Sequence, residues 1–132
     1  MRIMIDTNIL ISAILFPDST PSKLVEEVLE NYNLVLCSQI IDELHKVFNR
    51  KFENQIPNLE KFLSQLGYGL VYTPLNFDQS DYPNLRDKQD LPILVSAILG
   101  GIDYLVTGDK DFFEVETDKI EIISAREFLN NH

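Results

Sequence analysis

Short apolar runs alternate with longer segments of helical periodicity along this chain, and that alternation restricts the fold most. Each run has four or five residues, which fits a strand buried on both faces. The runs are Met1–Ile5, Leu34–Cys37, Leu70–Thr73, Asp103–Thr107 and Ile120–Ile123. Strands that alternate with helices pair in parallel through right-handed crossovers. The sequence therefore predicts an α/β domain of three layers, in which helices flank a central parallel sheet of four to five strands.

The segments between the runs have the apolar spacing and the end signals of helices. Thr20, followed by a proline, and Ser38 are residues of the kind that cap a helix start. Ser124 with Glu127 three residues later has the spacing of a capping box. The segment that begins at Asp90 is apolar on nearly every side, which indicates a buried helix. The predicted helices cover residues 7–16, 20–31, 38–50, 57–65 and 90–99 and a segment from 124 onward.

The length of 132 residues is that of one domain, which we expect to span residues 1–132. The single cysteine, Cys37, excludes an internal disulfide and favours a reducing compartment. No apolar run approaches the roughly 18 residues of a membrane span. The sequence thus predicts a soluble, cytoplasmic protein with no membrane association.

The charge balance is strongly acidic, with 21 Asp and Glu against 11 Lys and Arg and a net charge of -10. Such a chain has no overall attraction to the phosphates of a nucleic acid. An enzyme that acts on nucleic acid would need cations bound at an acidic site, or a basic partner. The simpler alternative is that the negative charge favours solubility.

Acidic residues recur where predicted strands end or where the following helices begin. Asp6 ends the first strand, Asp109 and Asp111 follow the fourth, and Asp90 begins the helix before it. Glu43 lies near the start of its helix, about 7.5 Å along the axis, and helical side chains lean toward the N-terminus. All these positions share one edge of a parallel sheet. Alone, Asp6 could be an ordinary helix cap and Glu43 a solvated helix residue, but together the acids predict a cluster of carboxylates.

The chemistry of such a cluster favours a divalent cation. Carboxylates that share a small volume repel one another and raise their own pKa values unless a cation neutralises them. Oxygen ligands suit Mg²⁺ or Mn²⁺ better than Zn²⁺, and neither His45 nor His132 has the spacing of a metal ligand. If the fourth strand pairs beside the first, Asp6 and Asp109 flank the preferred ligand site of an open α/β sheet. Phosphodiester cleavage is a reaction that this arrangement could support.

Four short motifs in this order resemble those of PIN-domain ribonucleases, in particular the VapC-type toxins of toxin-antitoxin pairs. They are Ile5-Asp6-Thr7-Asn8, Ile41-Asp42-Glu43-Leu44, Arg86-Asp87-Lys88-Gln89-Asp90 and Thr107-Gly108-Asp109-Lys110-Asp111-Phe112. The resemblance covers nearly the full length of the chain. It implies a Rossmann-like PIN fold and a metal-dependent endoribonuclease that cleaves RNA.

The resemblance also implies roles for individual residues. Asn8 and Thr107 would orient carboxylates or water through hydrogen bonds. Asp111 would be a further metal ligand or a neighbour of the ligands. The catalytic residues, which would also bind Mg²⁺ or Mn²⁺, are Asp6, Glu43, Asp90 and Asp109.

The third motif leaves an alternative open, because relatives commonly have more acids where this chain has Lys88 and Gln89. Asp87 and Asp90 are both candidates, and we favour Asp90 because it begins the buried helix. Lys110 either contacts phosphate or balances its acidic neighbours. Nucleases of this kind resemble homodimers that bind an antitoxin protein, whose basic residues could enter the acidic groove.

Two other functions compete with the nuclease. A metal-dependent phosphatase would use Asp6 as its nucleophile, but a haloacid-dehalogenase-like enzyme would have a second Asp at position 8, where this chain has Asn8. A non-catalytic PIN-fold binding module would keep the fold and pair with a partner protein. The intact set of acids argues against that module, because an unused site has no reason to hold uncompensated charge.

Overall fold

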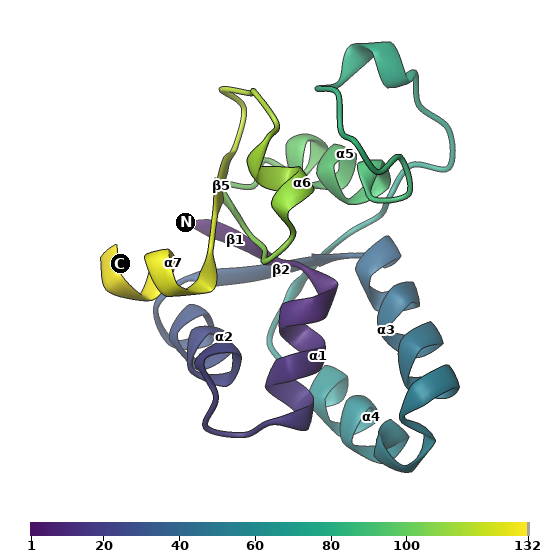
Figure 1. Ribbon diagram of the computed structural model, residues 1–132. Coiled ribbons are helices and arrows are strands. Elements are labelled where there is room, and N and C mark those ends of the chain that lie inside the picture. The colour runs from purple at the N-terminus through teal and green to yellow at the C-terminus, as the bar shows by residue number, and fades with distance from the viewer. Residues whose placement is uncertain (132) are drawn as a thin grey trace.

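The structure is a computed structural model that describes residues 1–131, so His132 lies outside the described residues. Five parallel strands form one sheet in the order β3-β2-β1-β4-β5 (Figure 1). The strands are β1 (Arg2–Ile5), β2 (Asn33–Cys37), β3 (Gly69–Val71), β4 (Tyr104–Val106) and β5 (Glu121–Ile123). The predicted parallel sheet of the α/β class is therefore confirmed.

Within the described residues, six α-helices and two 3₁₀ turns connect the strands, and a seventh α-helix follows β5. The helices are α1 (Thr7–Leu15), α2 (Thr20–Asn31), α3 (Ser38–Lys51), α4 (Ile56–Gln65), α5 (Leu91–Leu99), α6 (Lys110–Phe113) and α7 (Ala125–Asn131). The 3₁₀ turns are η1 (Glu53–Gln55) and η2 (Gln79–Asp81). None of these helices is long and apolar enough to cross a membrane.

The order of the strands places β1 at the centre. Met4 pairs with Val35 of β2 on one side and with Leu105 of β4 on the other. The chain first builds the sheet outward from β1 through β2 to β3, and then returns to add β4 and β5 on the opposite side. The reversal of strand order therefore falls between β1 and β4, so the pairing that the sequence left as a condition is the one observed.

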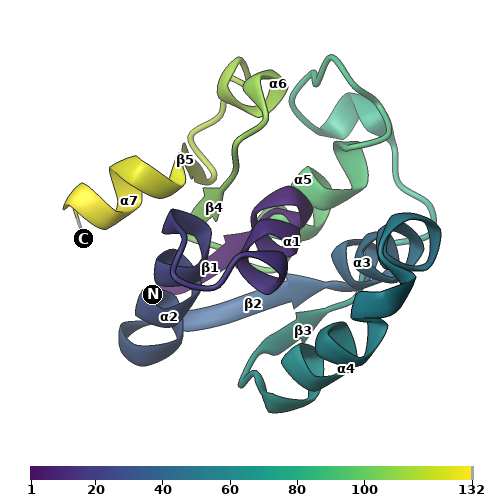
Figure 2. The same cartoon turned by 60° about the horizontal axis from the view of Figure 1, so that its bottom comes forward.

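Helices cover both faces of the sheet, because right-handed crossovers in opposite directions lie on opposite faces. Helices α1 to α4 and α7 lie on one side of β1 and β2, and α5 and α6 lie on the other (Figures 1 and 2). The central strands are buried on both sides, and Ile3, Met4 and Ile5 are fully inaccessible to solvent. Helix α5 is buried, as its apolar pattern on nearly every side predicted, since six of its nine residues are buried.

Several local predictions need correction. The α2 cap is Ser19, whose side chain accepts a hydrogen bond from the Ser22 N–H, and not Thr20. Ser38 does not cap α3, because its Oγ accepts the backbone N–H of Thr73 at 2.9 Å instead. The cap at Ser124 is confirmed, since its Oγ accepts the Glu127 N–H at 3.1 Å. The short helix α6 and both 3₁₀ turns were not predicted.

Candidate active site

Asp6 leaves the end of β1 and is the most buried of the candidate acids. Its backbone N–H donates to the carbonyl of Val106 at 2.9 Å, which ties the end of β1 to the end of β4. Its Oδ1 accepts the N–H of Thr7 at 2.8 Å, and its Oδ2 accepts the hydroxyl of Thr107 at 2.8 Å. The Asp6 side chain therefore caps α1 and also reaches across the strand-order reversal.

Thr107 connects two candidate acids at the end of β4. Besides donating to Asp6, its Oγ1 accepts the backbone N–H of Asp109 at 3.0 Å. Asp109 in turn caps α6, because its Oδ1 accepts the N–H of Asp111 at 2.9 Å. Thr107 is fully buried, so this orientation is fixed by the core and not by solvent.

Glu43 reaches the same edge from α3. Its Oε2 accepts the hydroxyl of Thr7 at 2.8 Å, and its Oε1 accepts the side-chain amide of Gln39 at 3.4 Å. Thr7 directly follows Asp6 and donates hydrogen bonds to both acids, so it links Asp6 and Glu43 at the start of α1. The side chain of Glu43 thus points toward the end of β1, from a helix 36 residues away in sequence.

Burial raises the pKa of Asp6 above its ordinary value of 3.8. Hydrogen bonds from Thr107 and Thr7 act in the opposite direction, because they stabilise the charged form. The negative charges of Glu43 and Asp109 raise the pKa further, which shows that both acids lie close enough to repel Asp6. Asp6 is thus a carboxylate for which a nearby positive charge would be favourable.

Asp90 is the N-cap residue of α5, but its side chain makes no capping hydrogen bond. Its pKa is raised to about 7, chiefly by burial and further by the charges of Asp87, Asp6 and Asp109. A side-chain hydrogen bond with Asp109 also favours the protonated form. Asp90 therefore faces the same edge as Asp6 and Asp109, while Asp87 is a close neighbour that repels it.

The remaining candidates lie at the margin of this group. Asp87 is exposed, and its Oδ1 accepts the N–H of Gln89 at 2.9 Å in a local turn. Asp111 is half-buried in the first turn of α6. Asn8 is exposed at the start of α1 and has a side chain on the cavity described next.

A cavity of about 360 Å³ adjoins the acids. Acidic and cationic side chains both line it, because it extends from the start of α1 along one face of α3. Its lining residues are Thr7, Asn8, Gln39, Glu43, Lys46, Val47, Arg50, Gln89 and Asp90. The structure thus brings Glu43 and Asp90 to one cavity, beside the buried Asp6.

The donor chemistry of these acids fits Mg²⁺ or Mn²⁺. Asp6, Glu43, Asp90 and Asp109 offer only oxygen atoms, and a divalent cation would relieve the repulsion that raises the pKa values of Asp6 and Asp90. Within residues 1–131, however, no three acidic, histidine or cysteine side chains are already grouped as a metal-binding set. Threonine, glutamine and backbone donors hydrogen-bond the carboxylates of Asp6, Glu43 and Asp109, whereas the Asp90 side chain makes no capping hydrogen bond.

Three polar residues in this region were missed by the sequence reasoning. Thr7 was read only as part of a motif, yet its hydroxyl positions Glu43. Lys46 and Arg50 were not singled out, although both line the cavity. The sequence does contain a pattern that could have identified Lys46 and Arg50. Together with Glu43 they recur at helical spacing, so the three residues must share one face of α3.

Comparison with known proteins identifies the sequence family. The family described as PIN domain matches residues 2–111, which is most of the chain. No curated protein matches the chain.

Solved structures share the fold. One is VapBC2 from Rickettsia felis, bound to a DNA fragment from its promoter, with 22% identity and a TM-score of 0.71 over 94% of this chain and 98% of that one. Another is DNA-bound VapBC from Salmonella typhimurium, with 17% identity and a TM-score of 0.67 over 95% of this chain and 98% of that one. At these identities the likeness establishes the architecture.

Proposed function

Because this chain belongs to the PIN domain family, we propose that it is a metal-dependent endoribonuclease that cleaves RNA phosphodiester bonds. The observation that supports this most is the convergence of acids from four separate segments on the strand-order reversal. Asp6 and Glu43 are joined through Thr7, Asp6 and Asp109 through Thr107, and Asp90 is repelled by both aspartates.

In this proposal Mg²⁺ or Mn²⁺ is held by Asp6, Glu43, Asp90 and Asp109, with Asp111 as a further ligand or neighbour. The ion, when bound, activates water and stabilises negative charge on the phosphate oxygens. Thr107 keeps the Asp6 carboxylate directed toward β4, and Asn8 lies exposed at the cavity, where it can orient water. Asp90 must lose its proton to bind the ion, so metal affinity should fall as the pH drops below about 7.

We further propose that the chain acts in the cytoplasm as a VapC-type toxin. Its family, and the fold that it shares with two VapBC complexes, support an antitoxin protein as its partner. We propose a homodimer as its assembly on the resemblance of its sequence motifs alone. Basic residues of an antitoxin would be attracted to the acidic edge around Asp6, which would block the site.

The test is cleavage of RNA by the purified chain in Mn²⁺ or Mg²⁺, with and without EDTA. Asp6→Asn keeps the size of the side chain and removes its charge, so cleavage should fall by at least about a hundredfold. Asp118→Asn is the matched control, because Asp118 is an exposed aspartate outside the site. Cleavage that persists in Asp6→Asn would contradict the proposal, and phosphate release from small phosphomonoesters in its place would favour a phosphatase.

A further inference from the structure

The C-terminal half of α3 gathers positive charge in a chain that has little of it. Lys46, Arg50 and Lys51 lie within six residues and make up three of the eleven Lys and Arg. All three are exposed. Within residues 1–131 the one ion pair closer than 4 Å joins His45 to Glu60, so no acid neutralises these three cations. The protein keeps three unpaired positive charges together despite its net charge of -10.

Two of these cations continue directly from the candidate active site. Glu43, Lys46 and Arg50 are separated by three and four residues, so they follow one face of α3. At 1.5 Å per residue, Lys46 lies about 4.5 Å and Arg50 about 10.5 Å beyond Glu43 along the helix axis. All three line the cavity that also contains Asp90. The positive charge therefore begins beside the acids and leads away from them.

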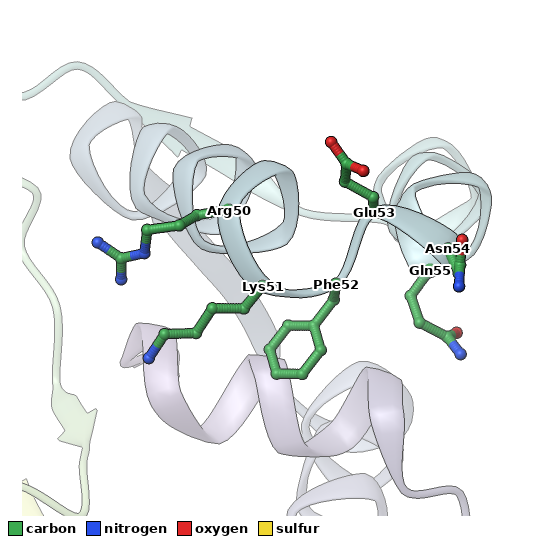
Figure 3. Close-up of a pocket in the computed structure, with 6 residues that line it drawn as sticks. All are labelled: Arg50, Lys51, Phe52, Glu53, Asn54 and Gln55. Atoms are coloured by element: carbon green, nitrogen blue, oxygen red, sulfur yellow. The ribbon is translucent and has the colours of Figure 1, made fainter.

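A second cavity, of about 450 Å³, extends the same path around the end of α3. Arg50 lines both cavities, and Lys51 and Phe52 line the second. Figure 3 shows the side chains of Arg50 and Lys51 extending to the same side of the helix end, while Glu53 points away from both. The path from Glu43 to Lys51 is thus continuous through Arg50. Glu53 also lines the second cavity at the far end of this path, with its side chain directed away from Arg50 and Lys51.

We propose that Lys46 and Arg50, with Lys51 beyond them, bind successive phosphates of a single-stranded RNA and lead it into the acidic site. This inference rests on the proposed nuclease function. A nucleic-acid backbone fits both ends of the path, because its phosphates pair with the cations and its scissile phosphate reaches the acids through a bound metal ion. An acidic peptide would pair with the cations but would have no favourable partner among the acids.

The proposal makes the reaction depend on substrate length on one side of the scissile bond. An RNA that offers no phosphate beyond the scissile one can reach the acids but not Lys46 or Arg50. Each added nucleotide on that side should therefore lower KM until both cations are engaged, after which further nucleotides should have a smaller effect.

The test neutralises the cations and measures salt dependence, because each phosphate contact with a single strand changes the slope of log affinity against log salt by about 0.7. The variants are Lys46→Gln, Arg50→Gln and both together. The control is Lys119→Gln, which removes the same charge from an exposed lysine just before β5, at the opposite edge of the sheet. Binding of a labelled single-stranded RNA is measured by anisotropy in EDTA, and KM for cleavage is measured in Mn²⁺.

We expect each single change to weaken binding by about 1.5- to 5-fold, and the double change by roughly 2- to 25-fold. The salt slope should become shallower by about 0.7 per cation relative to Lys119→Gln. Arg50→Lys should retain the slope, because it keeps the charge. If these cations only stabilise the C-terminal end of the α3 dipole, neutralising them would lower the melting temperature and leave the salt slope unchanged. That result would overturn the proposal.

The two proposals fail in different ways. If the unaltered chain does not cleave RNA in Mn²⁺ but binds it with the predicted slopes in EDTA, the nuclease proposal fails and the phosphate path stands. If the chain cleaves RNA while the double variant matches Lys119→Gln in KM and slope, the path is wrong and the nuclease proposal stands. Displacement of the RNA by an equal concentration of polyglutamate would also overturn the path, since it would indicate a site for acidic peptides.

Discussion

The substitution Asp90→Asn should make the metal-free protein more stable while it removes activity. At pH 8 Asp90 is charged, although burial and three neighbouring aspartates raise its pKa from 3.8 to about 7. Asparagine has nearly the same shape and no charge, so the repulsion disappears. No capping hydrogen bond is lost, because the Asp90 side chain makes none.

The expected gain follows from the pKa. A rise from 3.8 to about 7 corresponds to roughly 4 kcal/mol of unfavourable interaction for a group shielded from water. Asp90 is only half-buried, so solvent screening reduces this to about 1–2 kcal/mol. The lost interaction with the α5 dipole offsets about 0.3–1 kcal/mol. The net gain is thus at most about 1.7 kcal/mol, and 1 kcal/mol shifts the melting temperature of a chain of this length by about 3–4 °C, so we expect a rise of no more than about 7 °C.

The stability gained by Asp90→Asn should depend on pH, and the raised pKa of Asp90 fixes the direction of that dependence. Between pH 4 and pH 7 the folded protein holds a proton on Asp90 that the unfolded chain has released, so the free energy of unfolding decreases as the pH rises through this range. The advantage of Asp90→Asn should therefore be largest at pH 8 and nearly absent at pH 4.

The assay is thermal unfolding in EDTA and in Mn²⁺ at several pH values, with Asp118→Asn as a control for the loss of one negative charge. Saturating Mn²⁺, at about a hundred times its dissociation constant, should stabilise the unaltered chain by about 2.7 kcal/mol at pH 8 and Asp90→Asn by much less. A lower melting temperature for Asp90→Asn in EDTA at pH 8, or a gain that does not change with pH, would refute the reasoning.

Two further substitutions test how the site and the sheet are held. Thr107→Val keeps the shape of the side chain but removes two hydrogen bonds, the one donated to the buried Asp6 carboxylate and the one accepted from the Asp109 N–H. Urea unfolding should report a loss of about 1–3 kcal/mol, whereas equal stability would mean that these bonds are unimportant. Gly100→Ala would place a Cβ 2.8 Å from the Cγ2 of Val71 and 2.9 Å from the carbonyl oxygen of Ser96, and should also cost about 1–3 kcal/mol. Val71→Ala in the same chain should recover part of that loss, and no recovery would indicate that the backbone contact dominates.

The strands and helices could be predicted because their apolar periodicities are strong and local. Parallel pairing and right-handed crossovers then left few topologies, but the place of β4 beside β1 stayed a condition that only the structure could decide. The failures depended on tertiary contacts. Ser38 looks like a cap in isolation, but in the fold its hydroxyl accepts the N–H of Thr73, which follows β3. The short helix α6 has only four residues, too few for any periodicity.

The candidate site also has one part that could be predicted from the sequence and another that depends on tertiary contacts. The shared edge of the acids follows from topology alone, since strand ends and helix starts meet there. The hydrogen bond from Thr7 to Glu43 does not, because it depends on the rotation of α3 about its own axis. That rotation is set by the burial of Ile40, Leu44 and Phe48, and it places Glu43 and the exposed Lys46 on the same cavity.

The net charge of -10 and the positive surface on α3 act on RNA over different distances. Repulsion by the whole chain extends over about a Debye length, roughly 10 Å at 0.1 M salt, whereas the cations act on phosphates in direct contact. Added salt therefore weakens the contacts at Lys46 and Arg50 but also screens the repulsion, so the salt slope of the unaltered chain should be shallower than its phosphate contacts alone would give. Lys46→Gln and Lys119→Gln change the net charge equally, so the difference between them isolates the contact from the repulsion.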